Sequence, residues 1–142
     1  MLATAASLLE LGVTRERPLM ILSGNSLAQI VLIAACEYVG IPTAPVSPSY
    51  SLLSSEFTRL LGIHALLAPG AVFVESGPQF AMALQALGTP AAQVIAVHGA
   101  AGGQRDWRSI QEAPLTPERL VRVEAARAAI DPARDIDRKS VV

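Results

Sequence analysis

The stretch 18–50 constrains the fold most strongly, because it combines the patterns of a strand, a helix and a second strand. Residues 19–22 are four consecutive apolar residues bounded by a proline and by turn-forming residues, which is typical of a strand buried on both faces. Residues 43–46 predict the second strand. We expect the two strands to be parallel neighbours with a right-handed crossover, because strand twist lets the joining helix pack back only that way.

The helix between these strands has a marked start and a marked end. The hydroxyl of Ser26 can accept the backbone N–H of Gln29, and the Gln29 side chain can reach back to the backbone of Ser26, which is a reciprocal capping pattern. Gly40 can take the left-handed conformation that ends a helix, and Pro42 cannot continue one. These residues therefore predict a helix over about 27–39.

This helix is almost entirely apolar, with Gln29 and Glu37 as its clearly polar residues, so we expect it to be largely enclosed. It is shorter than the roughly 20 apolar residues that cross a bilayer, and it carries a charge, so we expect no membrane span. Cys36 lies inside it. We interpret Cys36 as a core residue, because a lone cysteine on a buried helix behaves as a small hydrophobic side chain.

The composition excludes several classes of function. A chain of 142 residues with net charge −1 and 16% charged residues offers no basic field for nucleic acid and no polybasic patch for a membrane surface. One cysteine excludes an intrachain disulfide and fits a reducing compartment, and residues 1–11 lack the positive start of a secretory signal, so we expect a cytoplasmic protein. The apolar content of 51% is high for a small domain without a membrane segment.

The remaining patterns alternate between helix and strand. Helices are predicted over 1–11, over 51–62 with Gly62 as the stop, over 77–87, and after the cap Thr116 with Pro117 as the first helical residue. Strands are predicted over 71–74 and 94–97. This alternation predicts an α/β fold with a mostly parallel sheet and flanking helices.

The charges of the last predicted helix fall at helical spacing. Glu118 with Arg122 is a favourable pair four residues apart, and Glu124 with Arg127 is one three residues apart. We interpret these charges as a solvated helix face.

Two patterns suggest chemistry of their own. Gly24-x-Ser26 at a strand-to-helix turn resembles the nucleophile elbow of an α/β-hydrolase, and the chain order Ser26, Glu75, His98 would permit a triad. Against this, capping explains Ser26 without chemistry, such hydrolases are much longer, and no oxyanion loop precedes the serine. The serine hydrolase is therefore the less favoured hypothesis.

The other candidate groups are weaker still. His64 is interpreted as a packed histidine, and His98 as the end of a strand beside a glycine loop, where ligands often bind. The glycines within 99–103 lack the G-x-G-x-x-G spacing and the following helix of a dinucleotide site. Two histidines, one cysteine and no close carboxylate cluster give no support for a metal site.

One segment resembles a known family. Ser-Gly-Asn-Ser at 23–26 before a helix, followed by Tyr-Val-Gly-Ile-Pro-x-Ala-Pro-Val-Ser-Pro-x-Tyr-Ser at 38–51, is similar to the N-terminal part of the AMP-forming (adenylate-forming) acyl-CoA synthetases. The residue sequence of this segment most resembles feruloyl-CoA synthetases. Later pieces, including Asp106-Trp107 in a loop, fall in the order that this family gives. The resemblance covers about 8–132, and 133–142 is a divergent tail.

The resemblance implies a partial N-terminal domain, over 1–142, of an AMP-dependent synthetase/ligase. Such an enzyme uses ATP and Mg²⁺ to activate a carboxylic acid, here an aromatic acid such as ferulate, as an acyl-adenylate and transfers it to coenzyme A. The family's phosphate loop is expected beyond Val142 and its lysine region later still, so we assign no catalytic, cofactor-binding or metal residue to this chain and expect it to be inactive alone.

Two readings of the chain follow. It is either an incomplete piece or remnant of an acyl- or aryl-CoA ligase, or a non-catalytic α/β module that binds another chain. Under the first reading, a sheet edge is expected to lack its neighbour, with 19–22 as an example of an exposed apolar strand, and some apolar helix surface is expected to stay uncovered.

Overall fold

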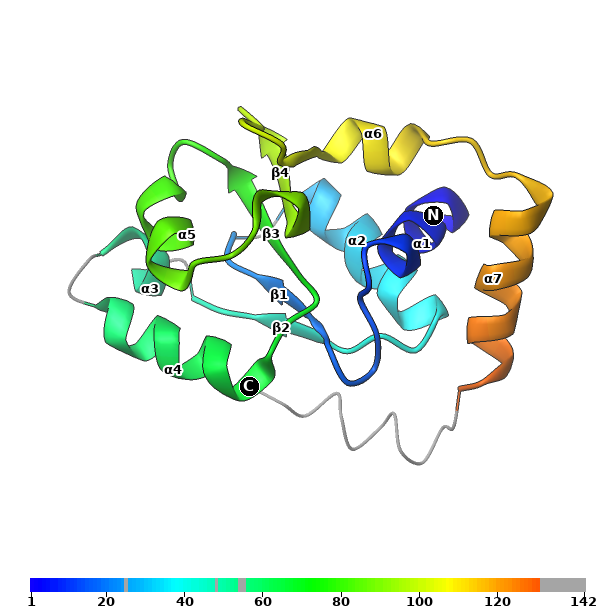
Figure 1. The fold of residues 1–142 in the computed structure, drawn as a ribbon, viewed down its shortest axis with the longest axis horizontal. Helices are drawn as coiled ribbons and strands as arrows, with labels where there is room; N and C mark the ends of the chain where they lie inside the picture. Colours follow the sequence, from blue (N-terminus) through cyan, green and yellow to red (C-terminus); the bar gives the residue numbers. More distant parts are fainter. Residues whose placement is uncertain (25, 48, 54–55, 131–142) are drawn as a thin grey trace.

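The computed structural model describes residues 1–24, 26–47, 49–53 and 56–130. The chain forms three layers, with one β-sheet between two layers of helices (Figure 1). Two parts of the sequence predictions lie outside the described residues, namely Asn25 in the segment 23–26 and the tail 133–142. The α/β class, with a parallel sheet flanked by helices, is confirmed.

The sheet has five strands in the order β2-β1-β3-β4-β5, and every pair of neighbours is parallel. The strands are β1 (Leu19–Ile21), β2 (Thr43–Pro45), β3 (Ala71–Ser76), β4 (Val94–His98) and β5 (Arg105–Asp106). The predicted pairing of β1 with β2 is confirmed, with Leu19 opposite Thr43.

β1 is a central strand rather than an exposed edge, so the example chosen from the sequence was wrong. Leu19 also lies opposite Ala71 of β3, and all three residues of β1 are buried. The edges are β2 and the two-residue β5. The physical reason is that the chain after β2 returns past β1 instead of continuing outward, which places β3 on the open side of β1.

The helices cover both faces of the sheet. Figure 1 shows α3, α4 and α5 on one side, and α1, α2, α6 and α7 on the other. Their bounds are α1 (Leu2–Glu10), α2 (Leu27–Tyr38), α3 (Ser49–Leu52), α4 (Phe57–Leu67), α5 (Ala81–Leu87), α6 (Trp107–Glu112) and α7 (Pro117–Ala128), with a 3₁₀ turn at Ala91–Gln93. None of the helices in the described ranges is both long and apolar enough to cross a bilayer.

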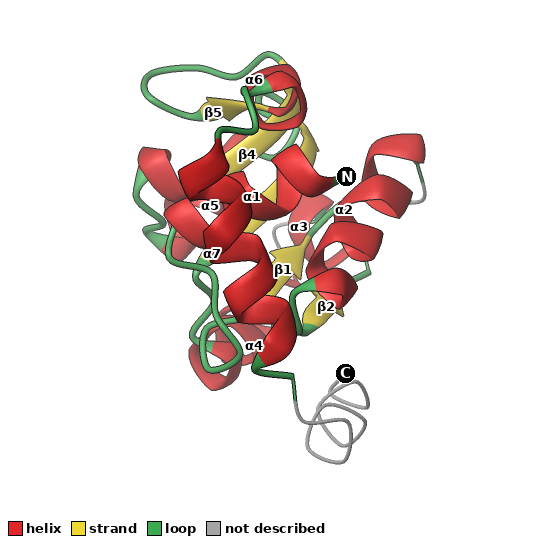
Figure 2. Ribbon diagram, turned by 90° about the vertical axis from the view of Figure 1, so that its right-hand side faces the viewer, coloured by secondary structure: helices red, strands yellow, loops and turns green. Residues whose placement is uncertain are grey.

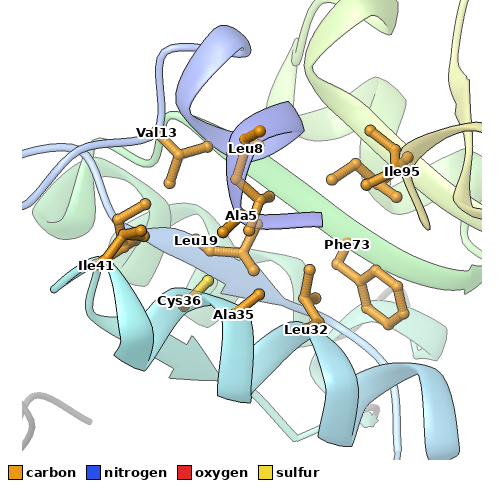
Figure 3. Packing of buried hydrophobic residues seen from close by; sticks show 14 of the residues in the cluster. Ala5, Leu8, Val13, Leu19, Leu32, Ala35, Cys36, Ile41, Phe73 and Ile95 are labelled. Carbon is orange, nitrogen blue, oxygen red and sulfur yellow. The ribbon is translucent and has the colours of Figure 1, made fainter. Parts of the chain in front are cut away.

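The core between the sheet and the layer of α1, α2, α6 and α7 is centred on Leu19 and Phe73. Figure 3 shows Leu8 of α1 and Leu32 of α2 packed toward these strand residues. Cys36 is fully buried in the same cluster, so its interpretation as a core residue is confirmed. The strand residues facing the other way, such as Met20, pack against α4 and α5. The alternation of side chains along each strand thus fills two cores from one sheet.

The start of α2 is only partly as predicted. Ser26 Oγ accepts the backbone N–H of Gln29 at 3.1 Å, which confirms the cap. The reciprocal bond is absent, because the Gln29 side chain is turned into the core and its Oε1 has no partner among the described residues. Gly40 has φ +74°, as the predicted helix end requires.

The expectation that α2 is largely enclosed was wrong for its outer face. The side of α2 that points away from the sheet leaves Leu27 82% exposed and Ile30 64% exposed. An apolar sequence therefore did not mean an enclosed helix. The result agrees with the separate expectation that some apolar helix surface stays uncovered.

The predicted helix 51–62 was wrong in its bounds. The structure has the short α3 and then α4, and α4 continues past Gly62 to Leu67. A glycine inside a helix costs only about 1 kcal/mol relative to alanine, and burying both Leu60 and Leu67 against the sheet outweighs that cost. The helix ends instead at Ala68, which has φ +44°.

The predicted charge pairs on α7 are absent from the ion pairs of the described residues. Arg127 instead lies over the ring of Tyr38, with its guanidinium carbon 4.4 Å from the ring centroid, and donates to the Tyr38 carbonyl at 3.2 Å. Arg119 joins α7 to α1 by donating to Ser7 Oγ at 2.8 Å and to Glu10. Figure 2 shows α7 alongside α1. The charged helix is therefore a packed element as well as a solvated one.

Candidate functional site

The strand order identifies one edge of the sheet as the candidate site. The chain leaves β1 toward β2 on one side and later enters β3 on the other side of β1, so the direction of winding reverses between β1 and β3. In open parallel sheets, ligands bind outside the carboxyl ends of the strands at such a switch point. The candidate site therefore consists of the described residues of the turns after β1 and β3, namely 22–24, Ser26 and 77–80.

The turn after β1 is held by backbone hydrogen bonds and carries small polar residues. The N–H of Leu22 donates to the carbonyl of Phe73 at 3.0 Å, which ties the turn to β3. Ser23 follows, only 4% exposed, and its Oγ has no partner among the described residues. Ser26 ends the turn as the cap of α2. This edge thus offers hydroxyl groups but no charge at the end of β1.

The turn after β3 is packed tightly against the turn after β4. Ser76 Oγ accepts the backbone N–H of Gln79 at 3.3 Å, and the N–H of Gly77 donates to the carbonyl of His98 at 2.9 Å. A Cβ at Gly77 would lie 2.6 Å from the Gly99 carbonyl oxygen, a distance that real side chains do not tolerate. There is no room for even a methyl group at this point, which explains the glycine.

The three residues of the hypothetical triad lie at this carboxyl edge but are not assembled. Ser26 follows β1, Glu75 lies near the end of β3, and His98 is the last residue of β4. Because β3 separates β1 from β4, Ser26 and His98 come from strands roughly 10 Å apart. No hydrogen bond joins any two of the three, all of which are described. The geometry gives the hydrolase hypothesis no support.

We expect Ser26→Ala to lower the free energy of unfolding by about 1 kcal/mol, because the α2 N–H groups lose their cap, whereas Ser26→Gly should cost only a few tenths. Urea unfolding of the three proteins measures this difference. A comparison variant is Ser109→Ala, which removes an exposed hydroxyl that donates to the Asp106 carbonyl at 2.7 Å instead of capping a backbone N–H. Covalent labelling of Ser26 by a serine-directed phosphonate would contradict a purely structural role.

Two other candidate residues also have structural surroundings. Burial of His64 on α4 lowers its pKa, so this histidine is neutral at physiological pH. It is partly buried, as expected for a packed histidine. Burial raises the pKa of the Cys36 thiol, and the neighbouring Glu37 raises it further. A neutral, enclosed thiol is a poor nucleophile.

The glycine loop after β4 serves the fold. Gly102 and Gly103 have positive φ, and they let the chain return so that Arg105 pairs with Ile95 in parallel. The sequence predicted the loop but missed β5 and α6. Asp106 was the available indication of α6, because its carboxylate accepts the N–H of Arg108 at 3.3 Å as an N-cap.

An open hollow of about 700 Å³ lies beside this loop. Its lining includes the side chains of His98, Gln104, Asp106, Arg108 and Gln111. His98, Asp106 and Arg108 are exposed, and Asp106 is already engaged as the cap of α6. The hollow is polar, but it shows no convergent set of donors or acceptors.

A phosphate group and a metal ion each need a particular set of protein groups. A phosphate cradle needs backbone donors and positive charge that converge on one point, and the ranges that the structure describes contain no lysine. The backbone N–H of Ala101 in the glycine loop is taken by Gln104 Oε1 at 3.1 Å. No group of three or more potential metal ligands occurs among those residues.

Comparisons with known proteins support the fold. No protein-family model matches the chain, and no curated protein matches it. Among solved structures, the chain is similar to the amide bond synthetase McbA from Marinactinospora thermotolerans, with 21% identity and a TM-score of 0.56 over 82% of this chain and 22% of that chain. A lysine-to-alanine mutant of the same synthetase matches with 23% identity and a TM-score of 0.55, over 82% of this chain and 23% of that chain. The chain therefore has the α/β fold of part of an amide bond synthetase and spans less than a quarter of its length.

Proposed function

We propose that this chain forms part of the N-terminal α/β domain of an ATP-dependent enzyme that activates a carboxylic acid as an acyl-adenylate. The observation that carries the proposal is the parallel sheet with its switch point between β1 and β3, which matches a synthetase structure over 82% of this chain. The motif at 38–51, which resembles the acyl-CoA synthetases, runs from the end of α2 through β2 to α3 in the described residues.

The finer proposal is an acyl- or aryl-CoA ligase similar to feruloyl-CoA synthetases, acting with ATP, Mg²⁺ and coenzyme A on an aromatic acid such as ferulate, in the cytoplasm. Its support is the residue sequence of the motif at 38–51 and the single buried cysteine, which fits a reducing compartment. In this proposal, the groups that act on the substrate belong to the rest of the enzyme. The role of the described residues is to position the carboxyl edge of the sheet against the rest of the enzyme.

A fusion tests this proposal directly. The chain replaces the matching segment of the amide bond synthetase, and pyrophosphate release is measured with ATP and the host's own acid. The intact synthetase is the positive control, and the synthetase with the segment deleted is the negative control. We expect release well above the deletion control. A folded, monodisperse fusion that releases no more pyrophosphate than the deletion control would contradict the proposal.

For the chain by itself, we expect no detectable ATP binding by calorimetry and no pyrophosphate release with ATP and ferulate. The physical reason is that the described residues provide no convergent phosphate donors with positive charge. Saturable ATP binding to the purified chain would contradict the expectation that the described residues form no phosphate site.

The second candidate is a non-catalytic α/β module that binds another chain. The exposed apolar residues of α2, Leu27 and Ile30, favour it as much as they favour an incomplete enzyme domain. The fusion experiment separates the two, because a module with an unrelated partner has no reason to restore pyrophosphate release.

A further inference from the structure

The charges of this chain are distributed very unevenly over its two helix layers. From residue 18 to residue 93 the charged residues are Glu37, Glu56, Arg59 and Glu75 alone. On the opposite side of the sheet, α7 by itself carries five charged residues, namely Glu118, Arg119, Arg122, Glu124 and Arg127. A helix layer that faces water normally carries charge on its outer side. The layer formed by α4 and α5 carries very little.

The outer side of α4 and α5 is apolar and exposed. Leu66 is 83% exposed and Met82 is 68% exposed, and Leu61 also reaches the surface. Ala65 and Ala86 are exposed as well. We call these five residues the α4–α5 face. α5 has no charged residue, and the two helices contact each other. Depletion of charge with retention of large apolar side chains is typical of the core of a protein interface.

A groove of about 190 Å³ adjoins this face at Leu66. Its lining includes Leu67, Pro42 and Thr43 together with the charged residues Arg15 and Glu16, so it runs between the end of α4, the loop before β1 and the edge strand β2. It offers a place for an apolar side chain of a partner next to polar groups. The surface next to the α4–α5 face is therefore hollowed as well as partly apolar.

The edge strand β2 is blocked against the addition of a partner strand. Pro45 in β2 has no N–H to donate to a further strand, and proline is a residue that blocks the addition of strands at edges. A partner must therefore pack onto the helices rather than beside β2.

We propose that the α4–α5 face packs against the remaining part of the adenylate-forming domain. This inference rests on the proposed function. A fold of this kind belongs to a chain of which the present one spans 22%, so most of the surface available to cover this face belongs to the same enzyme. On the other layer, the charged helix α7 then faces solvent, and the exposed Leu27 and Ile30 of α2 form a separate apolar surface. A second copy of the chain is the alternative occupant, and the experiment distinguishes it.

The three methionines of the chain provide the test, because hydroxyl-radical footprinting with mass spectrometry reads each one separately. Met82 lies on the α4–α5 face, Met1 is 49% exposed at the other side of the molecule, and Met20 is fully buried. In the isolated chain we expect rapid oxidation of Met82 and Met1 and slow oxidation of Met20. In the fusion with the synthetase we expect Met82 to be protected several-fold while Met1 keeps its rate.

The outcomes separate this inference from the proposed function. A fusion that releases pyrophosphate while Met82 is oxidised as fast as in the isolated chain overturns the inference and leaves the function standing. A folded fusion that is inactive but protects Met82 overturns the function and leaves the packing face standing. Protection of Met82 in the isolated chain that disappears on dilution identifies a second copy as the occupant and also overturns the inference.

A pair of variants keeps the inference testable if the fusion does not fold. In the isolated chain, Leu66→Glu combined with Met82→Glu should remove part of the binding of a hydrophobic dye, because the α4–α5 face is open, while the exposed Leu27 and Ile30 of α2 continue to bind dye. The matched control is Val121→Glu on α7, where an exposed apolar residue is surrounded by charges, and there we expect little change. Equal dye binding by the double variant and the parent chain would show that this face is not an open apolar surface.

Discussion

Phe73→Ala should lower the free energy of unfolding by about 3–5 kcal/mol, the usual cost of removing a buried aromatic side chain. Phe73 is fully buried in the central strand β3, and its ring meets Trp107 edge-on, with 5.9 Å between centroids and 81° between planes. Small domains are stable by only about 5–15 kcal/mol in total. Urea unfolding should therefore show a large shift of the midpoint.

Phe73→Leu is the matched control, because it keeps most of the buried volume and loses the ring contact with Trp107. We expect it to cost about 0.5–1.5 kcal/mol, the size of an aromatic pair. A loss below 1 kcal/mol for Phe73→Ala would mean that the core under α1, α2 and α6 is not packed as described.

Arg119→Ala should lower the free energy of unfolding by about 1.5–3 kcal/mol, the range for hydrogen bonds made by a charged group. The guanidinium of Arg119 donates to Ser7 Oγ, to Glu10 and to the Pro114 carbonyl, so one side chain joins α7, α1 and the loop before α7. Glu10 is half exposed, and its ion pair with Arg119 is therefore a minor part of the effect. Thermal or urea unfolding measures the loss.

Two further variants decide whether the geometry or the charge matters. Arg119→Lys keeps the charge but cannot donate to three acceptors in the fork geometry of a guanidinium, so it should lose most of the same stability. Arg122→Ala removes an exposed arginine from the same helix and should stay within about 0.5 kcal/mol of the parent. If Arg119→Ala and Arg122→Ala lowered the free energy of unfolding equally, Arg119 would not join α7 to α1 as described.

Local patterns predicted the centre of the fold well. The pairing of β1 with β2, the cap at Ser26 and the stop at Gly40 each depend on residues close in sequence, and all three are present. The same patterns could not show what packs on the other side of β1. That neighbour, β3, is determined by the path of the chain after β2, and short-range spacing does not record it.

The errors have a common cause in tertiary packing. Gly62 predicted a helix end, but burial of Leu60 and Leu67 carries α4 through it. Gln29 predicted a reciprocal cap, but its side chain is buried instead. The charges of the last helix were predicted to form a solvated face, but Arg119 on that helix contacts Ser7, more than a hundred residues earlier in the sequence. Such contacts are visible only once the chain is folded.

The candidate site was predicted in outline only. The carboxyl edge of the sheet could be anticipated from parallel strands, and His98 was placed there from the sequence. The buried, unpartnered hydroxyl of Ser23 and the close approach of Gly77 to Gly99 were not predicted, because both depend on how neighbouring turns meet.

The position of β1 between β2 and β3 in a parallel sheet creates the switch point and underlies the likeness to a synthetase structure. The most direct measurement is solution NMR of the isolated chain, reading through-space contacts between backbone protons of neighbouring strands. We predict contacts between the backbone protons of Met20 and those of residues adjacent to Ala44 in β2. Met20 should make the same kind of contacts with residues adjacent to Val72 in β3, both in the parallel pattern. Contacts to only one of these strands, or an antiparallel pattern, would contradict the account.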